Sequence, residues 1–204
     1  DSQLGEQFER EARTLARLRH PALPKVSDHF TENDNQYLVM DHISGDDLAS
    51  RLKSTQKPFP LSWVLYWADQ LLDALAYLHS HEPPIIHRDI KPANILLENG
   101  VERVKITDFG LARAIDDITV SRTGEVSGTP QYMSPEQACG ERVDHRSDLF
   151  SLGCVMYAMC TGHSPFRGDS IAHVIKRVTQ DTPRPIADQN PEIPLWLIEI
   201  ITCL

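Results

Sequence analysis

The chain has 204 residues, 41% of them hydrophobic and 24% charged, which is the ordinary range of a soluble globular protein. Its formal net charge of −9 argues against nucleic acid as the main partner, because binding a phosphate backbone requires a basic surface. No apolar run approaches the length of a membrane span, and the four cysteines show no CxxC spacing, which favours a reducing compartment. We therefore expect a cytoplasmic chain with no membrane segment. A longer protein could still carry an anchor outside these residues.

The first 47 residues predict one helix, two strands and a linker. Apolar residues recur at helical spacing from Phe8 to Leu18, and Pro21 ends the pattern. Glu11 lies on the same face, which places a carboxylate on an apolar stripe. The next segment, "KVSDHFTENDNQYLVMDHI", is typical of two short strands joined by the polar turn "TENDN". "SGDDL" then indicates a linker in which Gly45 acts as a hinge.

Two long helices dominate the rest of the chain. Residues 61–80 are apolar on nearly every face, which predicts a central helix with Ser62 as its N-cap. A second apolar helix is predicted from Ser147 to Gly162, followed by helical segments between proline-rich loops. The last residues, "LWLIEIITCL", contain no helix stop signal, and the first residues lie almost within a helical pattern. We therefore expect the chain to be part of a larger domain.

A hairpin is predicted between these helices. Asn99-Gly100 is a strong turn signal between "ILL" and "VKI". Asn94 precedes the first of these strands and Asp108 follows the second, so both residues should lie at the open end of the hairpin. Residues 108–136 show little periodicity, and a segment of that length without regular structure is usually functional or disordered.

The side chains expected at this open end suit phosphoryl transfer. Asp89, Asn94 and Asp108 offer oxygen atoms, and Lys91 offers a mobile positive charge. Magnesium prefers oxygen ligands and usually binds one or two carboxylates together with substrate phosphates. Phosphoryl transfer depends mainly on positioning and on charge stabilisation, which these residues could supply.

Three motifs in sequence order extend this interpretation: "HRDIKPAN" at 87–94, "DFG" at 108–110 and "GTPQYMSPE" at 128–136. They resemble the catalytic loop, the metal-binding loop and the substrate loop of protein kinases. Lys91 and Thr129 are similar to the residues found at these positions in the serine/threonine branch of the family. The segment "YMSPEQ" resembles that of its bacterial members. The resemblance implies a two-lobed α+β fold. Residues 1–43 would be a partial N-lobe with a helix and strands, and residues 44–204 a mostly helical C-lobe lacking its C-terminal end.

The resemblance also implies catalytic roles, with ATP and Mg²⁺ as cofactors and Ser/Thr residues of proteins as substrates. Asp89 would accept or orient the proton of the substrate hydroxyl, and Lys91 would neutralise the γ-phosphate. Asn94 and Asp108 would hold the magnesium ions.

Further residues would support the nucleotide in the same family pattern. Met40 would guard the adenine pocket, and the backbone from Asp41 to Ile43 would form the hinge. Asp47 would reach the ribose, and Leu96 would lie beneath the adenine ring.

Glu11 matches the helix glutamate that pairs with a strand lysine, but the pattern is incomplete around it. The family has a glycine-rich loop and that lysine upstream, whereas here only Gly5 precedes Glu11 and the first lysine is Lys25. Glu136 also lacks the later arginine that usually pairs with it. We expect the missing parts to lie in a longer protein, and the chain alone to bind ATP weakly and transfer phosphate poorly.

The resemblance assigns structural roles to two residues near the catalytic loop. His87 would be a packing and hydrogen-bonding residue, one of a stacked set with Leu15, Val26 and Phe109. Asp148 could be the N-cap of its helix, the resemblance implies that it bonds the backbone of the catalytic loop, and the two roles are compatible.

Regulation by phosphorylation is implied as well. Arg88 and Arg113 would capture a phosphate on the activation loop, with Thr123 as the first choice of site and Ser121 as the second. The alternative is that the hydroxyls of this loop, Ser127 included, only keep it soluble. Thr129 would instead contact Asp89 and Lys91, and a kinase dimer would serve phosphorylation in trans.

Two other classes of protein remain open. One is a non-catalytic pseudokinase or scaffold, which the upstream sequence would reveal if the strand lysine were truly lost. The other is a small-molecule kinase such as an aminoglycoside phosphotransferase, which also carries an Asp and an Asn in its catalytic loop. "GTPQYMSPE" argues against the second, because it resembles a peptide-substrate feature.

Overall fold

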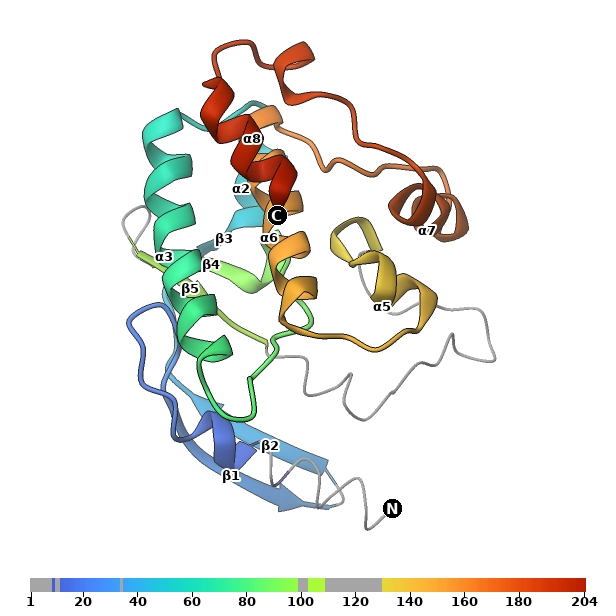
Figure 1. Ribbon diagram of the computed structural model, residues 1–204. Coiled ribbons are helices and arrows are strands. Elements are labelled where there is room, and N and C mark those ends of the chain that lie inside the picture. Colours follow the sequence, from blue (N-terminus) through green and yellow to red (C-terminus); the bar gives the residue numbers. More distant parts are fainter. Residues whose placement is uncertain (1–8, 10–11, 34, 99–102, 109–129) are drawn as a thin grey trace.

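The computed structural model describes residues 9, 12–33, 35–98, 103–108 and 130–204, and Figure 1 shows their arrangement. A small sheet near the N-terminus lies at one end of the molecule, and helices make up most of the other end. A second sheet lies between them. This arrangement confirms the expected α+β fold with N-terminal strands and a mostly helical C-terminal part.

The N-terminal sheet consists of β1 (Val26–Glu32) and β2 (Asn35–Met40). The strands are antiparallel, and their register runs from Val26↔Met40 to Glu32↔Asn35, with one irregularity between Val26 and Asp28. Both strands were predicted from the sequence and are confirmed. Phe30 and Tyr37 stack across the pair with ring centroids 5.0 Å apart, which stabilises the register on the exposed face.

The second sheet has the order β3-β4-β5, formed by β3 (Gly45–Asp47), β4 (Ile95–Glu98) and β5 (Arg103–Ile106). The predicted antiparallel pairing of β4 and β5 is confirmed, with Ile95 opposite Ile106, whereas the Asn99-Gly100 turn lies outside the described residues. The interpretation of "SGDDL" as a linker is wrong. Residues 45–47 form a strand because β4 offers an open edge, along which Asp47 pairs with Leu96.

Six helices accompany the sheets within the described part of the chain. They are α2 (Leu48–Thr55), α3 (Leu61–His79), α5 (Pro135–Cys139), α6 (His145–Thr161), α7 (Ile171–Gln180) and α8 (Leu195–Cys203). Short 3-10 turns occur at Pro92–Asn94, Pro130–Tyr132 and Ile186–Asp188.

The core forms between α3, α6 and the buried face of the β4–β5 hairpin. Leu71 and Leu75 of α3, Val155 of α6 and Ile95 of β4 belong to one continuous hydrophobic cluster. Both long helices were predicted, but the N-cap of α3 was not. Pro60 occupies that position instead of Ser62, and no side chain caps this helix end. Proline fits there because it has no N–H to satisfy.

The segment between the first helical turn and β1 packs against the helical part. The Ile106 N–H of β5 donates to the Ala22 carbonyl at 2.8 Å. The His20 ring stacks on Tyr77 of α3 with centroids 5.1 Å apart, and its Nε2 contacts the Asp73 carboxylate at 3.1 Å. These contacts hold the N-terminal sheet to the rest of the molecule.

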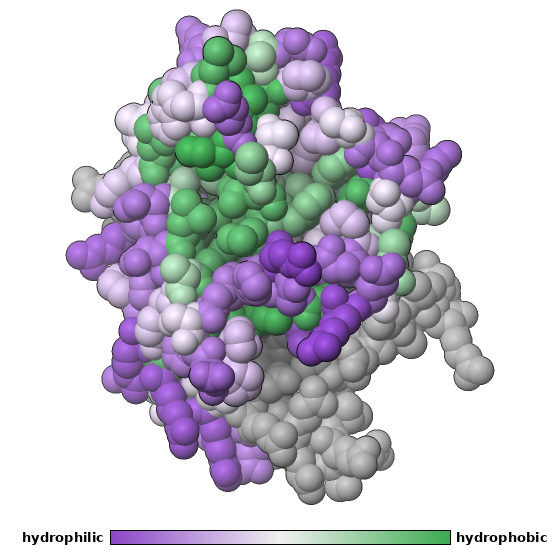
Figure 2. Space-filling view, viewed as in Figure 1, coloured by the Kyte–Doolittle hydropathy of each residue, from purple (hydrophilic) through white to green (hydrophobic). Residues whose placement is uncertain are grey.

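Hydrophobic side chains gather over α8 and the surface beside it in Figure 2. Leu195, Trp196 and Ile200 of α8 are all exposed. Among the described residues, no helix has both the length and the apolar character required to cross a bilayer.

Candidate active site

The loop "HRDIKPAN" runs from the end of α3 towards β4, and the buried carboxylate of Asp148 binds its backbone. Asp148 Oδ2 accepts from the His87 N–H at 2.8 Å and Oδ1 accepts from the Arg88 N–H at 2.8 Å. The Nε2 of His79 lies 2.8 Å from the same Oδ2. Of the two roles considered for Asp148, bonding the catalytic loop is therefore the one found, while Asp144 caps α6.

His87 is fully buried and uses both ring nitrogens. Its Nε2 lies 3.1 Å from the Thr107 carbonyl, which can only accept, and its Nδ1 lies 3.3 Å from the Asp89 N–H, which can only donate. The ring is therefore a neutral imidazole with its proton on Nε2. Burial lowers its pKa, outweighing the nearby charge of Asp148, which raises it. His87 links the loop to the end of β5, and neither nitrogen is placed to act as a base.

Asp89, Lys91 and Asn94 form one hydrogen-bonded cluster. Lys91 Nζ lies 2.7 Å from Asp89 Oδ2, and Asn94 Nδ2 donates to the same oxygen at 2.9 Å. Asn94 Nδ2 also donates to the Asp89 carbonyl at 2.9 Å. The side chains of Asp89 and Lys91 are 20% and 18% exposed, so the cluster is partly dry but open to a ligand.

Asp108 lies beside this cluster because the residue before β4 is hydrogen-bonded to the residue after β5. The Thr107 N–H donates to the Asn94 carbonyl at 2.9 Å, and Asp108 is the next residue. Asp108 is exposed and has φ 55°. The predicted convergence of Asn94 and Asp108 at the open end of the hairpin thus agrees with the geometry.

The donor set fits a magnesium ion. The Nδ2 of Asn94 binds Asp89, so the Oδ1 of Asn94 points away from that carboxylate. Asp108, the residue after Thr107, presents an exposed carboxylate. Two such oxygen donors are the usual protein contribution when nucleotide phosphates complete the shell. No cluster of three or more His, Cys, Asp or Glu suited to a metal occurs in the described part of the chain.

The residues expected around the nucleotide base and ribose fall into two groups. Met40 is partly buried at the end of β2, and Asp41 follows it, accepting the Lys25 N–H at 3.0 Å. Ile43 is partly exposed two residues further on. Asp41 thus binds the chain as it enters β1 to the chain as it leaves β2.

Asp47 and Leu96 are direct partners across β3 and β4. Asp47 also caps α2, accepting from the Ser50 N–H at 2.8 Å and from its hydroxyl at 2.7 Å. Burial raises the pKa of Asp47, but the two hydrogen bonds from Ser50 and those from the backbone of Asp47 and Ala49 together lower it by more, so the net shift is downward. Its carboxylate stays ionised at neutral pH beside the half-buried Leu96.

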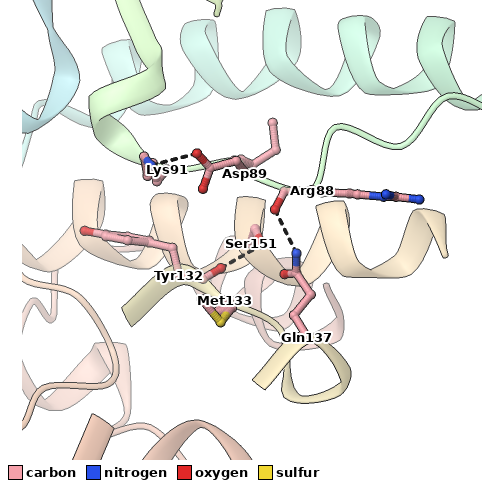
Figure 3. A pocket seen from close by; sticks show the side chains of 8 residues that line it. Arg88, Asp89, Lys91, Tyr132, Met133, Gln137 and Ser151 are labelled. Atoms are coloured by element: carbon pink, nitrogen blue, oxygen red, sulfur yellow. Dashed lines mark hydrogen bonds and ion pairs between the residues drawn. The ribbon is translucent and has the colours of Figure 1, made fainter. Parts of the chain in front are cut away.

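A pocket opens between the catalytic loop and residues 130–151, as Figure 3 shows. Its lining includes Asp89, Lys91, Tyr132 and Gln137. Gln137 Nε2 donates to the Arg88 carbonyl at 2.7 Å, a contact absent from the sequence-based site. In the sequence, Gln137 is marked only by the capping-box pattern "SPEQ", which predicts a helix start but not the contact with Arg88.

Glu136 has a hydrogen-bond partner other than the arginine of the family pattern. The Ser147 hydroxyl of α6 donates to the Glu136 carboxylate. The partner was missed because it comes from a helix start whose hydroxyl has no periodic signature in the sequence.

Of the stacked set proposed around His87, Leu15 and Val26 are buried members of the main hydrophobic cluster. Several other sequence-based assignments lie outside the described residues: Glu11, Phe109, Arg113, Ser121, Thr123, Ser127 and Thr129.

The chain belongs to the protein kinase family, since residues 1–202 match the family model described as the protein kinase domain. It is 43% identical over 204 residues to the serine/threonine-protein kinase PknB of Mycolicibacterium smegmatis. It is 40% identical over 205 residues to the serine/threonine-protein kinase PknA of Mycobacterium tuberculosis. These alignments cover 95% and 98% of this chain but only 32% and 47% of the respective relatives.

Proposed function

We propose that this chain forms the catalytic part of a serine/threonine protein kinase that transfers the γ-phosphate of ATP to hydroxyl groups of proteins. The observation that carries the proposal is the cluster of Asp89, Lys91 and Asn94, joined at 2.7 and 2.9 Å and placed beside Asp108. Family membership and similarity to kinases named for serine and threonine support the same reaction.

Each residue of the cluster has a chemical role. Asp89 is held by Lys91 and Asn94 through Oδ2, so its carboxylate is oriented to accept or orient the proton of a substrate hydroxyl. Lys91 supplies the positive charge nearest to that carboxylate and would neutralise the transferred phosphate. Asn94 and Asp108 would hold Mg²⁺, which when bound neutralises phosphate charge.

The nucleotide would lie between the two sheets. Met40 and the backbone from Asp41 to Ile43 would face the adenine ring, with Leu96 beneath it. Asp47 would accept a hydrogen bond from the ribose while keeping its cap on α2. Glu11 would pair with a strand lysine in a longer protein. The division into residues 1–43 and 44–204 remains part of this proposal.

The experiment measures transfer from labelled ATP to a Ser/Thr peptide with Mg²⁺, comparing wild-type protein with Asp89→Asn. The substitution keeps size and hydrogen bonding but removes the proton acceptor, so we expect at least a 100-fold loss of kcat. Asp188→Asn, an exposed aspartate in a separate 3-10 turn, is the matched control and should keep wild-type kcat. Equal activity of Asp89→Asn and wild type would contradict the proposal.

The same reactions test regulation and the alternatives. Mass spectrometry should find phosphate on Thr123 or Ser121 after autophosphorylation. Arg88 and Arg113 would bind this phosphate, and a dimer would carry out the reaction in trans. Phosphate absent from residues 121–127 would count against this regulation. The second candidate is a non-catalytic scaffold that binds partners through the same fold. It predicts no peptide phosphorylation and no shift of Tm with Mg-ATP.

A further inference from the structure

Gln137 uses its side-chain amide in two directions. Its Oε1 accepts from the Ser134 N–H at 3.0 Å, which completes a capping box at the start of α5. Its Nε2 donates to the Arg88 carbonyl at 2.7 Å (Figure 3). A carbonyl can only accept and an N–H can only donate, so these two contacts fix which end of the amide faces which partner.

The contact with Arg88 falls on a strained position of the catalytic loop. Arg88 has φ 66°, a left-handed conformation that costs a non-glycine residue about 1–3 kcal/mol. Its N–H is bound by Asp148 of α6 at 2.8 Å, and its carbonyl is bound by Gln137 of α5. Side chains from two separate helices therefore hold the N–H and the carbonyl of Arg88. The next residue is Asp89, whose direction depends on that backbone.

The segment that precedes Gln137 is hydrogen-bonded to α6. Ser151 Oγ of α6 lies 2.7 Å from the Tyr132 carbonyl, to which it donates, and the Ser147 hydroxyl donates to Glu136. The segment that carries Gln137 is thus held to the same helix that carries Asp148. Any movement of the start of α5 would be transmitted to the Arg88 carbonyl.

We propose that Gln137 is a positioning residue for Asp89, acting through the Arg88 carbonyl and coupling the start of α5 to the catalytic loop. The proposal rests on the proposed kinase function. The position requires a donor and an acceptor on one planar group of this length. Glutamate keeps the acceptor but loses the donor, and leucine loses both.

Gln137→Glu therefore separates the two contacts. Its carboxylate still accepts the Ser134 N–H, so α5 keeps its cap, but it places a charged oxygen against the Arg88 carbonyl. We expect kcat for peptide phosphorylation to fall about tenfold, which corresponds to about 1.4 kcal/mol, with less than twofold change in KM for ATP. The deficit should shrink at lower pH, because a protonated glutamic acid regains an O–H donor. Gln137→Leu should show a similar deficit without this pH dependence.

Ser170→Ala is the control for general destabilisation, because it removes a helix cap away from the site. Ser170 caps α7 by accepting from the His173 N–H at 3.2 Å. We expect this variant to lose stability and to keep kcat within twofold of wild type. A loss of kcat in Ser170→Ala as large as in Gln137→Glu would show that general destabilisation explains the effect, which would overturn the proposal.

Amide hydrogen exchange provides a readout that does not depend on activity. Gln137→Glu should speed exchange in residues 86–91 and leave α3 unchanged. If wild type transfers no phosphate, the proposed function fails, while faster exchange would still support the coupling and unchanged exchange would overturn it. In an active enzyme, wild-type kcat in Gln137→Glu or unchanged exchange would each overturn the positioning role.

Discussion

Arg88 and Asp108 share a backbone feature, since both adopt left-handed conformations, with φ 66° and 55°, although neither is glycine. Such conformations persist only where surrounding contacts hold them, and they are concentrated at functional sites. Here the N–H of Arg88 is held by Asp148, and the residue before Asp108 is bound to Asn94. One strained residue, Asp108, carries an oxygen proposed to hold magnesium, and the other, Arg88, directly precedes the proposed proton acceptor Asp89.

His87 predicts a pH dependence of stability. Burial holds its pKa below the ordinary value near 6.5, so the folded protein keeps the ring neutral while the unfolded chain takes up a proton as pH falls. This residue's contribution is therefore lost as pH drops below about 6.5, at up to about 1.4 kcal/mol per pH unit. His87→Phe lacks this loss.

The measurement is urea unfolding of both proteins at two pH values. At pH 7.5 we expect His87→Phe to be about 2 kcal/mol less stable, because the Thr107 carbonyl and the Asp89 N–H lose their partner. At pH 5.5 the gap should be smaller. A gap that widens on acidification would mean that folded His87 is protonated.

At this scale the spacing of the sequence located the reactive side chains, and the family resemblance suggested the support from Asp148, but neither indicated Gln137. Asp89, Lys91 and Asn94 lie within one short motif, so their proximity follows from local spacing. Gln137 and Asp148 contact the same loop from 49 and 60 residues away, and no periodicity relates such positions. Only the tertiary fold brings these supports to the loop.

Gly162 ends α6 in a way that only a small residue allows. It has φ 81°, and an added Cβ would lie 3.2 Å from the Lys57 carbonyl carbon. The Gly162 N–H also donates to the Ala158 carbonyl at 2.8 Å, which closes the helix. The end of α6 and the loop before α3 are thus packed backbone against backbone.

Gly162→Ala should destabilise the protein by at least about 1 kcal/mol, because alanine pays for the left-handed conformation and meets the Lys57 backbone. Thermal unfolding measures the effect. Gly162→Asn separates the two causes, since asparagine tolerates the conformation but brings the same Cβ. If Gly162→Asn matches wild type in Tm, the close approach to Lys57 has no energetic weight.

Elements with strong periodicity were the ones predicted. The helices α3 and α6 and the β1–β2 and β4–β5 pairings follow from apolar spacing and, at "TENDN", a polar turn. β3 was missed because three residues, Gly45–Asp47, carry no alternation and two are aspartates, which are rare in strands. β4 determines this strand by offering a free edge, and α2 then begins from the cap that Asp47 provides.

At the scale of the whole molecule, His20 joins the N-terminal segment to α3 through its ring stack on Tyr77 and its contact with Asp73. His20→Ala removes the stack on Tyr77 and the acceptor for the Ala22 N–H at 3.1 Å, so we expect a loss of about 1–2 kcal/mol. Hydrogen exchange should become faster in β1 and β2 than in α6. Asp73→Asn is the matched control.

The control separates packing from charge. The Asp73 side chain is 75% exposed, and ion pairs at such positions contribute little, so Asp73→Asn should cost less than about 0.5 kcal/mol. If Asp73→Asn destabilises the protein as much as His20→Ala, the charge rather than the ring stack holds the N-terminal segment.

Lys25 and Asp41 are joined by two hydrogen bonds, and this affects how the N-terminal sheet can move. The chain passes between the small sheet and the helical part twice, before β1 and after β2. These two passages are tied together by the Asp41 N–H to the Lys25 carbonyl at 3.0 Å and by the return bond to the Asp41 carboxylate. We therefore expect the β1–β2 sheet to move as one unit about this point, with its far tip displaced more than Met40, which lies next to the tied residues.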